Sequence, residues 1–376
     1  MNKKSKKILV IYQDWDDMFL NNISKFDYWF DRMDGAYDKN NTYYILSFGL
    51  SEKKIQLRDN VIVEYVKSSP KKQLLDIFKY HRKLKQVIED FKPNYIYNWF
   101  LYLGSAIPKK RTLKVISFLR DKTPEMIRGK GGIRSLLGFY FYFLDYLSMK
   151  RTDILLYNGE SLAKYAKKLG FKKKMIFCPR PIADIDSFKI KNNENLIEKY
   201  NLKNKQVILS VARLTKEKNM ELGIHALSEM PENFVYLIIG SGINKTNLQT
   251  LAKNLNLQKR VIIIDFIEHR KIWEYYNIAN VFWLLSKTDF EGTPNVIQEA
   301  FYAKVPVVVS NVSSMRNIVE NNVNGIILDS FSPKELSNKT QDLILDKKVY
   351  KSFQIEGYKK VKSIIKQRFE IKTLFK

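Results

Sequence analysis

The sequence predicts an α/β protein made of two doubly wound domains, each a parallel sheet with helices on both faces. Three observations predict this class. The chain has 376 residues, more than one hydrophobic core usually organises. Short apolar runs alternate with helix-like stretches in both halves. A polar segment rich in Lys and Asn interrupts the alternation at 180–204, beginning beside Pro179 and Pro181.

In the first half, β-rich apolar runs are separated by longer stretches with helical spacing. We expect helices at Lys71–Phe91, Arg134–Lys150 and Ser161–Leu169. The clearest is Lys71–Phe91, whose apolar residues recur every three or four positions. We expect strands at Ile8–Tyr12, Tyr43–Phe48, Val61–Val66, Tyr95–Trp99, Leu113–Phe118 and Ile154–Tyr157.

In the second half the alternation is more regular. Strands are expected at Val207–Val211, Val235–Ile239, Val261–Asp265, Val281–Leu285 and Val305–Val309, with helices at Glu221–Met230, Asn247–Leu255, Arg270–Ala279 and Pro294–Ala303. We therefore predict an N-terminal domain at 1–182, a linker at 183–205 and a C-terminal domain at 206–350. A helical segment at 351–376 is expected to pack back toward the first domain. Two such domains enclose a cleft, and ligands of these sheets sit beyond the carboxyl ends of the strands.

The composition excludes several classes of protein. Cys178 is the single cysteine, which excludes a disulfide framework and a cysteine-rich metal site. The three histidines are scattered without ligand spacing, so we expect no catalytic zinc. The N-terminal apolar run Ile8–Tyr12 is too short for a secretory signal. No apolar stretch reaches the length of a membrane span, so a cytoplasmic location is expected.

The formal net charge is +26, from 65 Lys and Arg against 39 Asp and Glu. Such a charge favours polyanionic partners: nucleic acid, an anionic membrane surface or phosphorylated small molecules. A general bias toward Lys explains part of the excess. The basic residues are spread along the chain without a clustered arm, so no nucleic acid is expected as a partner.

The most informative segment is Ser286–Ala300, which leaves a predicted strand, forms a loop and enters a helix. Thr293 is expected to cap this helix and Pro294 to occupy its first turn. A helix start presents N–H groups and a positive dipole end, and both favour phosphate. Gly292 lacks a Cβ and lets a ligand approach the backbone. The segment therefore predicts an anion-binding site.

Two carboxylates flank this anion site. Glu291 lies on the loop, and Glu299 shares a helix face with Asn295 and Val296, so it points back toward the loop. Such carboxylates accept hydrogen bonds from sugar or ribose hydroxyls. The alternative interpretation is a solvated loop charge and an ordinary surface helix residue. The Gly-Thr-Pro-Asn-Val sequence between the acids and the apolar strands on both sides favour the site.

Two further loops carry candidate donor contacts. Arg213 and Lys218 follow the first strand of the second half, where they can hold a diphosphate and stabilise it as a leaving group. A basic surface loop is the alternative. Gly240-Ser241-Gly242 ends the next strand, and a plain strand-to-helix turn is the alternative there.

Taken together, these pieces resemble the retaining glycosyltransferases of family four, the glycosyl transferases group 1, which have the GT-B architecture of two Rossmann-like domains. The residues that carry the resemblance appear in the family's order: Arg213–Asn219, Gly240–Gly242, Phe266, Glu291–Ala300 and Pro306–Val309. The match is specific in the second half and vague in the first. It implies donor binding mainly to the C-terminal domain, acceptor binding mainly to the N-terminal domain, and no required metal or cofactor.

The resemblance also implies a role for each residue. Arg213 and Lys218 would hold the phosphates of a UDP- or GDP-linked sugar, and Glu291 would bind hydroxyls of the transferred sugar. The backbone of Thr293, Pro294, Asn295 and Val296 would contact sugar and diphosphate, with Gly240, Gly242 and Gly292 admitting the donor. Glu299 would hold the ribose, and the base would lie near Ile267. A glycan or lipid-linked acceptor of cell-surface polysaccharide synthesis, reached at the inner face of the membrane, is the expected partner.

The sequence departs from the family pattern at four places. One is that none of the three histidines stands where the family often has a first-domain histidine. Phe266–His269 contains no glycine, Lys304 stands where a small residue is common, and the first loop, Gln13–Asp17, lacks glycine. These departures leave an alternative open, a sugar-nucleotide-binding protein with lost or altered transfer. An inverting two-domain transferase also stays open.

Basic and aromatic residues adjoin in the first half. Arg128–Arg134 precedes the helix-like stretch Ser135–Met149, whose centre is Phe139–Phe143. This pattern fits docking on an anionic membrane. The alternative is a helix buried against the first sheet, which the apolar residues on nearly every side favour.

Overall fold

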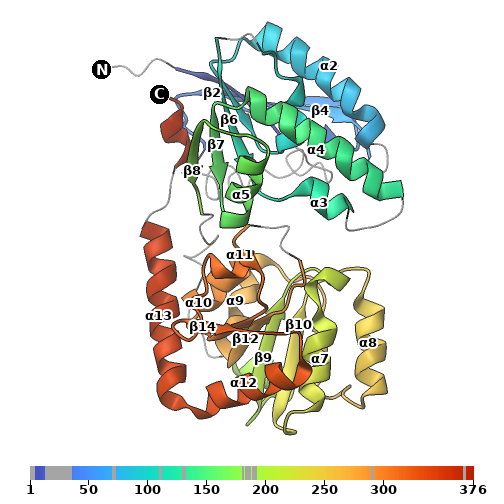
Figure 1. Cartoon of the computed structure of the whole chain (residues 1–376), viewed down its shortest axis with the longest axis vertical. Helices are drawn as coiled ribbons and strands as arrows, with labels where there is room; N and C mark the ends of the chain where they lie inside the picture. Colours follow the sequence, from blue (N-terminus) through green and yellow to red (C-terminus); the bar gives the residue numbers. More distant parts are fainter. Residues whose placement is uncertain are drawn as a thin grey trace. The chain divides into compact units, whose positions relative to one another are not determined.

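The computed structural model describes residues 5–12, 36–69, 73–109, 112–128, 133–179, 182, 188, 193–288, 292–366 and 370–376. The chain divides into two compact units. The first unit is Met1–Arg180 with Phe290–Gly292 and Arg368–Lys376, and the second is Pro181–Asp289 with Thr293–Gln367. Each unit contains one β-sheet with helices packed on it (Figure 1). The predicted class of two doubly wound α/β domains is confirmed.

The first sheet has the order β3-β4-β2-β1-β5-β6-β7-β8. Its strands pair in parallel except β3, which is antiparallel to β4. Chain connections run outward in both directions from β1 and β5, so the strand order reverses between these two neighbours. The strands are β1 (Lys7–Ile11), β2 (Thr42–Gly49), β3 (Lys53–Arg58), β4 (Val61–Lys67), β5 (Tyr95–Asn98), β6 (Lys114–Leu119), β7 (Ile154–Tyr157) and β8 (Lys174–Phe177).

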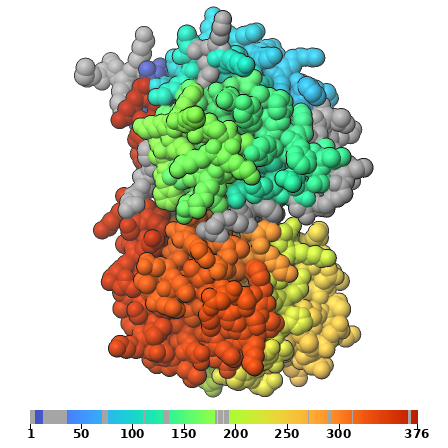
Figure 2. Space-filling view, viewed as in Figure 1, coloured from blue at the N-terminus to red at the C-terminus, as the bar shows by residue number. Residues whose placement is uncertain are grey.

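Helices cover the first sheet because successive strand residues point to opposite faces. Leu9 and Ile11 join a core with apolar residues of α2 and α4, whereas Ile8 and Val10 join a core on the other face with Phe375. The outer side of α4 forms part of the molecular surface (Figure 2). The helices of this unit are α2 (Gln73–Phe91), η2 (Leu101–Ala106), α3 (Thr123–Arg128), α4 (Ile133–Arg151), α5 (Glu160–Lys168) and η5 (Ile371–Leu374).

The second sheet is parallel throughout, with the order β11-β10-β9-β12-β13-β14. The first strand of this unit, β9, lies between β10 and β12, so the order reverses between β9 and β12. In open α/β sheets, ligands bind beyond the carboxyl ends of the strands at such a reversal. The strands are β9 (Gln206–Val211), β10 (Phe234–Ile239), β11 (Val261–Ile264), β12 (Val281–Leu284), β13 (Val307–Val309) and β14 (Gly325–Ile327).

Two cores lie on opposite faces of the second sheet. One contains residues of α7, α8 and α12, and the other contains residues of α9, α10 and α11. Helix α6 lies inside the segment predicted as a linker. The helices are α6 (Glu194–Lys199), η4 (Lys216–Lys218), α7 (Met220–Ser228), α8 (Lys245–Asn254), α9 (His269–Ile278), α10 (Asn295–Tyr302), α11 (Ser313–Arg316), α12 (Pro333–Leu345) and α13 (Lys347–Lys366).

Every predicted strand and helix is present, and several elements are additional. Strand β3 escaped prediction because its sequence, Lys-Lys-Ile-Gln-Leu-Arg, is polar and lies at the edge of the sheet. Strands β8 and β14 are short, with four and three residues. Among the residues that the structure describes, no helix combines the length and the apolarity needed to cross a bilayer.

Candidate active site

Three loops meet at the carboxyl edge of the second sheet, beside the reversal between β9 and β12. The loop after β9 is joined to the loop after β10 by two backbone bonds, from Leu214 N to Ser241 O (2.8 Å) and from Asn244 N to Leu214 O (3.0 Å). The loop after β12 is joined to it by a bond from Lys287 N to Glu217 O (2.8 Å). The loops that carry the predicted donor residues of this unit therefore form one connected edge.

Gly240 and Gly242 make this loop packing possible. A Cβ on Gly240 would lie 1.9 Å from Ala212 O, and one on Gly242 would lie 2.3 Å from Leu214 O. These neighbours are backbone atoms, so neither contact can be relieved by a side-chain rotation. The two glycines thus shape the edge by letting the β10 loop approach the β9 loop. Direct contact of these glycines with a donor stays a prediction.

Both predicted cations stand in the β9 loop. Arg213 is exposed, and Lys218 is half-buried at the end of η4. The turn closes at Asn219, whose left-handed backbone (φ 53°, ψ 41°) leads into α7. Asparagine tolerates this conformation better than most residues. The loop therefore places a guanidinium and an ammonium group at the carboxyl end of β9.

Helix α10 begins one residue later than the sequence predicted. Pro294 is its N-cap, with extended backbone (φ −70°, ψ 124°), and Asn295 is the first helical residue. The predicted cap at Thr293 is wrong because the extended ψ of Pro294 keeps the chain outside the helix for one residue more. Proline has no N–H, so the N–H groups of Asn295, Val296 and Ile297 form the start of the helix.

Glu299 lies on α10 with only 5% of its surface exposed. Its Oε1 is 3.0 Å from Nε2 of His269, and its Oε2 accepts a hydrogen bond of 2.9 Å from the hydroxyl of Tyr276. The interpretation of Glu299 as an ordinary surface residue is therefore wrong. A buried carboxylate needs such partners, since burying a charge without them is strongly unfavourable.

Sequence reasoning missed His269 and Tyr276. Both lie on α9, seven residues and about two turns apart, so they share one face of that helix. Burial first, and then the neighbouring Glu299 carboxylate, hold the pKa of Tyr276 well above its usual value. Its hydroxyl therefore stays protonated and donates to Glu299. The i, i+7 spacing of two polar groups on one helix face was the available signal.

The loop after β11 carries the residues predicted to lie near the base. Phe266 is 77% exposed, whereas Ile267 is half-buried and packs on the core beside α9 and α10. At the start of this loop, Asp265 Oδ1 lies 2.6 Å from Nζ of Lys245. An exposed aromatic ring thus stands at the carboxyl end of β11.

Not every predicted residue falls at this edge of the second unit. Glu291 lies outside the described residues, as does the first loop, Gln13–Asp17. Gly292 is buried and groups with the first unit. Thr293, also buried, begins the part of the loop that groups with the second.

The carboxyl edge of the first sheet carries aromatic rings and one cation. Tyr12 and Trp99 follow the neighbouring strands β1 and β5, with ring centroids 4.4 Å apart. Arg120 follows β6, and its guanidinium lies 4.0 Å from the centroid of the Trp99 ring. No motif marks these residues in the sequence, although each directly follows a strand of the structure. Trp99 is buried beneath the half-buried Arg120, so the arrangement offers a planar cation held on an aromatic ring.

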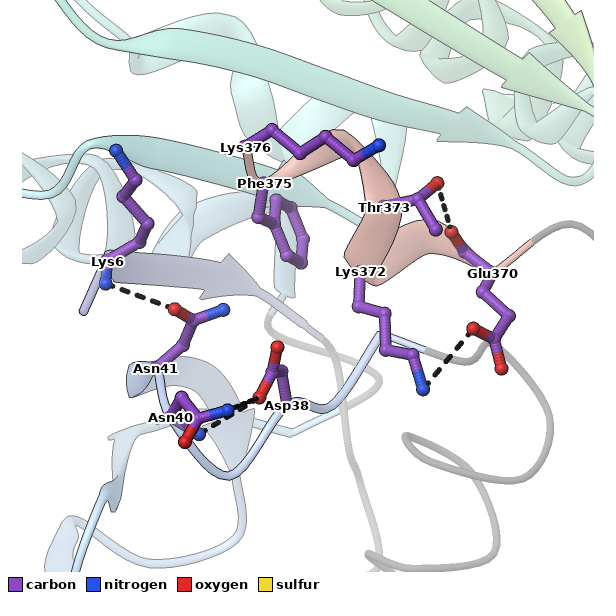
Figure 3. A pocket seen from close by; sticks show the side chains of 9 residues that line it. All are labelled: Lys6, Asp38, Asn40, Asn41, Glu370, Lys372, Thr373, Phe375 and Lys376. Atoms are coloured by element: carbon purple, nitrogen blue, oxygen red, sulfur yellow. Dashed lines mark hydrogen bonds and ion pairs between the residues drawn. The ribbon is translucent and has the colours of Figure 1, made fainter. Parts of the chain in front are cut away.

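A separate cavity of about 580 Å³ lies in the first unit (Figure 3). It lies at the amino ends of β1 and β2, beside Lys6 and Asn41, with Phe375 on one wall. The Lys6 amide donates to Asn41 Oδ1 (3.0 Å), and Lys372 pairs with Glu370 (3.3 Å). This edge is opposite to the one where parallel α/β sheets bind ligands, so we do not assign the donor to it.

Residues 192–360 match the family described as Glycosyl transferases group 1. The chain is 36% identical over 141 residues to the amylovoran biosynthesis glycosyltransferase AmsK of Erwinia amylovora, covering 34% of this chain and 35% of that protein. It is 28% identical over 339 residues to the capsular polysaccharide biosynthesis glycosyltransferase CapM of Staphylococcus aureus, covering 83% of each.

Solved structures resemble the whole chain. One is Anabaena Alr3699/HepE in complex with UDP, with a TM-score of 0.72, 19% identity and coverage of 98% of this chain and 97% of that one. Another is the sucrose-phosphate synthase of Thermosynechococcus elongatus, with a TM-score of 0.79, 14% identity and coverage of 98% and 99%. These likenesses establish the fold. With two doubly wound sheets and the family match over 192–360, the chain belongs to the glycosyl transferases group 1 family and has the GT-B fold.

Proposed function

We propose that this protein transfers a sugar from a nucleoside-diphosphate sugar to a glycan acceptor, with retention of the anomeric configuration. One observation carries the proposal: the Arg213–Lys218 loop and the loop leading to α10 are joined at the carboxyl edge of the second sheet. Cations and a helix start both stabilise the negative charge that develops on a departing diphosphate. The proposed donor site needs no metal ion.

In this proposal, Glu291 binds hydroxyls of the transferred sugar and Glu299 binds the ribose. The backbone from Thr293 to Val296 contacts the sugar and the diphosphate. A UDP-linked or GDP-linked donor fits these contacts, and the similar protein HepE was solved with UDP and with UDP-glucose. The exposed Phe266 beside Ile267 offers an apolar surface for the base.

The buried setting of Glu299 suits a ribose contact. Each carboxylate oxygen has two acceptor positions, and His269 and Tyr276 each engage one oxygen. One acceptor position on each oxygen remains for the two ribose hydroxyls. Because the carboxylate is already oriented, binding requires little further ordering of this side chain.

The proposed chemical step is a displacement on the face from which the leaving group departs. The acceptor hydroxyl oxygen forms a bond to the anomeric carbon while the bond from that carbon to the diphosphate oxygen breaks. The hydroxyl proton passes to the departing diphosphate, whose charge Arg213, Lys218 and the start of α10 stabilise. Closure around the donor would exclude water and so limit hydrolysis.

The proposed acceptor is a lipid-linked precursor of cell-surface polysaccharide, reached at the inner face of the membrane. Relatives of this chain are named for amylovoran, colanic acid and capsular polysaccharide biosynthesis. At the first sheet, Arg120 offers a planar fork for an anionic group.

The proposal is tested by measuring the release of nucleoside diphosphate from a panel of nucleotide sugars, with and without glycan acceptors. We expect release with one donor and a matching acceptor, and strong loss of release in Glu299→Gln. Binding of a donor without transfer to any acceptor would favour the alternative, a sugar-nucleotide-binding protein. The anomeric configuration of the product, read by nuclear magnetic resonance, separates retention from inversion.

A further inference from the structure

Helix α4 presents an unusual outer face. Among its residues whose side chains the structure describes, 135–151, five are exposed, and four of these are large and apolar. We call these four the outer stripe: Leu136, Phe139, Phe143 and Tyr146, which are 69%, 57%, 53% and 39% exposed. The fifth exposed residue is Lys150. A solvent-facing helix side normally carries charged residues.

The spacing aligns these side chains along the helix. At about 100° per residue, positions 136, 139, 143 and 146 fall within an arc of about 80° and extend over about 15 Å. The opposite face of α4 is packed, with Phe141, Leu144 and Met149 at 5% exposure or less. The alternative predicted for this segment, a helix buried against the first sheet, therefore describes only one face of α4. The helix buries one apolar face and exposes another.

Cations adjoin two rings of the outer stripe. The Arg128 guanidinium, at the end of α3, lies 4.6 Å from the ring centroid of Phe139, and Lys150 Nζ lies 5.2 Å from that of Tyr146. Gly138 permits the first contact, since a Cβ there would lie 2.1 Å from Arg128 Cγ and 2.9 Å from Pro124 O. Figure 2 shows α4 at the surface of the first unit in that view.

We propose that the outer stripe is a docking face for an anionic phospholipid bilayer, with its rings among the headgroups and α4 parallel to the surface. A line of rings beside Arg and Lys matches the chemistry of that interface. The exposed residues of α4 within 135–151 include no acid, and the chain carries a net charge of +26. Both complement a negative lipid surface. Docking needs no turnover, so it can be tested independently of the proposed transfer.

Flotation of the full chain with vesicles tests the proposal. We expect flotation with phosphatidylcholine vesicles that contain phosphatidylglycerol, and much less with phosphatidylcholine alone. Phe139→Ser combined with Phe143→Ser should reduce the partition coefficient by about tenfold or more, since each ring loses its apolar burial. The matched control is Leu345→Ser with Ile355→Ser, which removes two exposed apolar side chains of the second unit (74% and 43% exposed).

The cations are tested in the same assay. Arg128→Gln and Lys150→Gln should each weaken binding about fivefold at low salt, which corresponds to about 1 kcal/mol per cation near a charged surface. The control is Lys253→Gln with Lys259→Gln, two exposed lysines of the second unit. Thermal unfolding should be unchanged in all these variants, because every substituted side chain is exposed. Equal flotation of the stripe variants and the controls would overturn the proposal.

A direct reporter of depth completes the test. In a Cys178→Ala background, Phe143→Cys labelled with an environment-sensitive dye should shift to the blue on adding anionic vesicles, and Lys253→Cys should not. The other occupant to consider is a second copy of the chain. Light scattering without lipid tests whether the wild type forms a dimer that Phe139→Ser combined with Phe143→Ser loses. Such a loss, together with normal flotation of the variant, would contradict bilayer docking.

Discussion

Replacing Tyr276 by phenylalanine isolates the hydroxyl that orients Glu299. This hydroxyl lies 2.9 Å from Glu299 Oε2 and 3.2 Å from the carbonyl of Val296, in a buried setting. A hydrogen bond to a charged group contributes about 1.5–3 kcal/mol, so Tyr276→Phe should lower the free energy of unfolding by about 2 kcal/mol. For a unit of this size, Tm should fall by about 4–8 °C.

The same substitution should affect donor binding more than the chemical step. A ribose contact is made equally in the ground state and the transition state, so its loss raises KM for the donor and leaves kcat nearly unchanged. The assays are thermal unfolding and steady-state release of nucleoside diphosphate.

Tyr275→Phe is the matched control, because the Tyr275 hydroxyl is 3.3 Å from another neutral hydroxyl, that of Tyr200. We expect Tyr275→Phe to cost less than about 1 kcal/mol and to leave donor KM unchanged. Equal stability of Tyr276→Phe and Tyr275→Phe, or a lower kcat with unchanged KM in Tyr276→Phe, would contradict the assigned role of the Tyr276 hydroxyl.

Three further predictions follow from the structure. Glu299→Gln and Glu291→Ala should each lower kcat/KM by about 100-fold or more, measured as nucleoside diphosphate release at low donor concentration, while circular dichroism stays normal. A near-normal kcat/KM in both would exclude the assigned roles. Gly242→Ala should destabilise the fold by about 2 kcal/mol or more, because the added Cβ would lie 2.3 Å from a backbone atom. The control is Gly170→Ala, where φ is +78° and no atom lies within 4 Å of the added Cβ, so this change should cost only about 1 kcal/mol. Equal urea midpoints of the two variants would argue against the loop packing. Burial, together with the charges of Lys85 and Arg151, lowers the pKa of His81 to about 4, so the unfolded chain binds the proton more readily and stability should fall as pH drops from about 6.5 toward about 4. Solvent screening limits this loss to about 1 kcal/mol at pH near 5, and His81→Gln should reduce it; an identical pH dependence in that variant would contradict the assignment.

The sheets could be predicted from sequence because their strands are short apolar runs between polar turns. β9, β10 and β12 are almost wholly buried, and their sequences contain hardly any polar residue. β3 has the opposite character, since an edge strand faces solvent and needs no apolar run. The apolar pattern therefore identified every interior strand and the edge strand β11, and it missed the edge strands β3, β8 and β14.

The candidate site was predictable in position but not in its contacts. Glu299 and the β9 loop are local features of sequence. The contact of Glu299 with His269 joins residues 30 positions apart, and it depends on how α9 packs against α10. The exposed apolar face of α4 could not be predicted for a similar reason. Its two faces are both apolar, so periodicity could not tell which one meets the sheet.

The proposed transfer depends on binding of a nucleoside-diphosphate sugar by the joined loops of the second unit. Thermal unfolding of the wild-type chain and of Arg213→Ala with Lys218→Ala, against a panel of nucleotide sugars, tests this binding most directly. At a ligand concentration about 100 times Kd, binding should stabilise the wild type by about 2.7 kcal/mol, and the variant should lose most of that gain. Equal stabilisation of both proteins, or none by any nucleotide sugar, would contradict this binding.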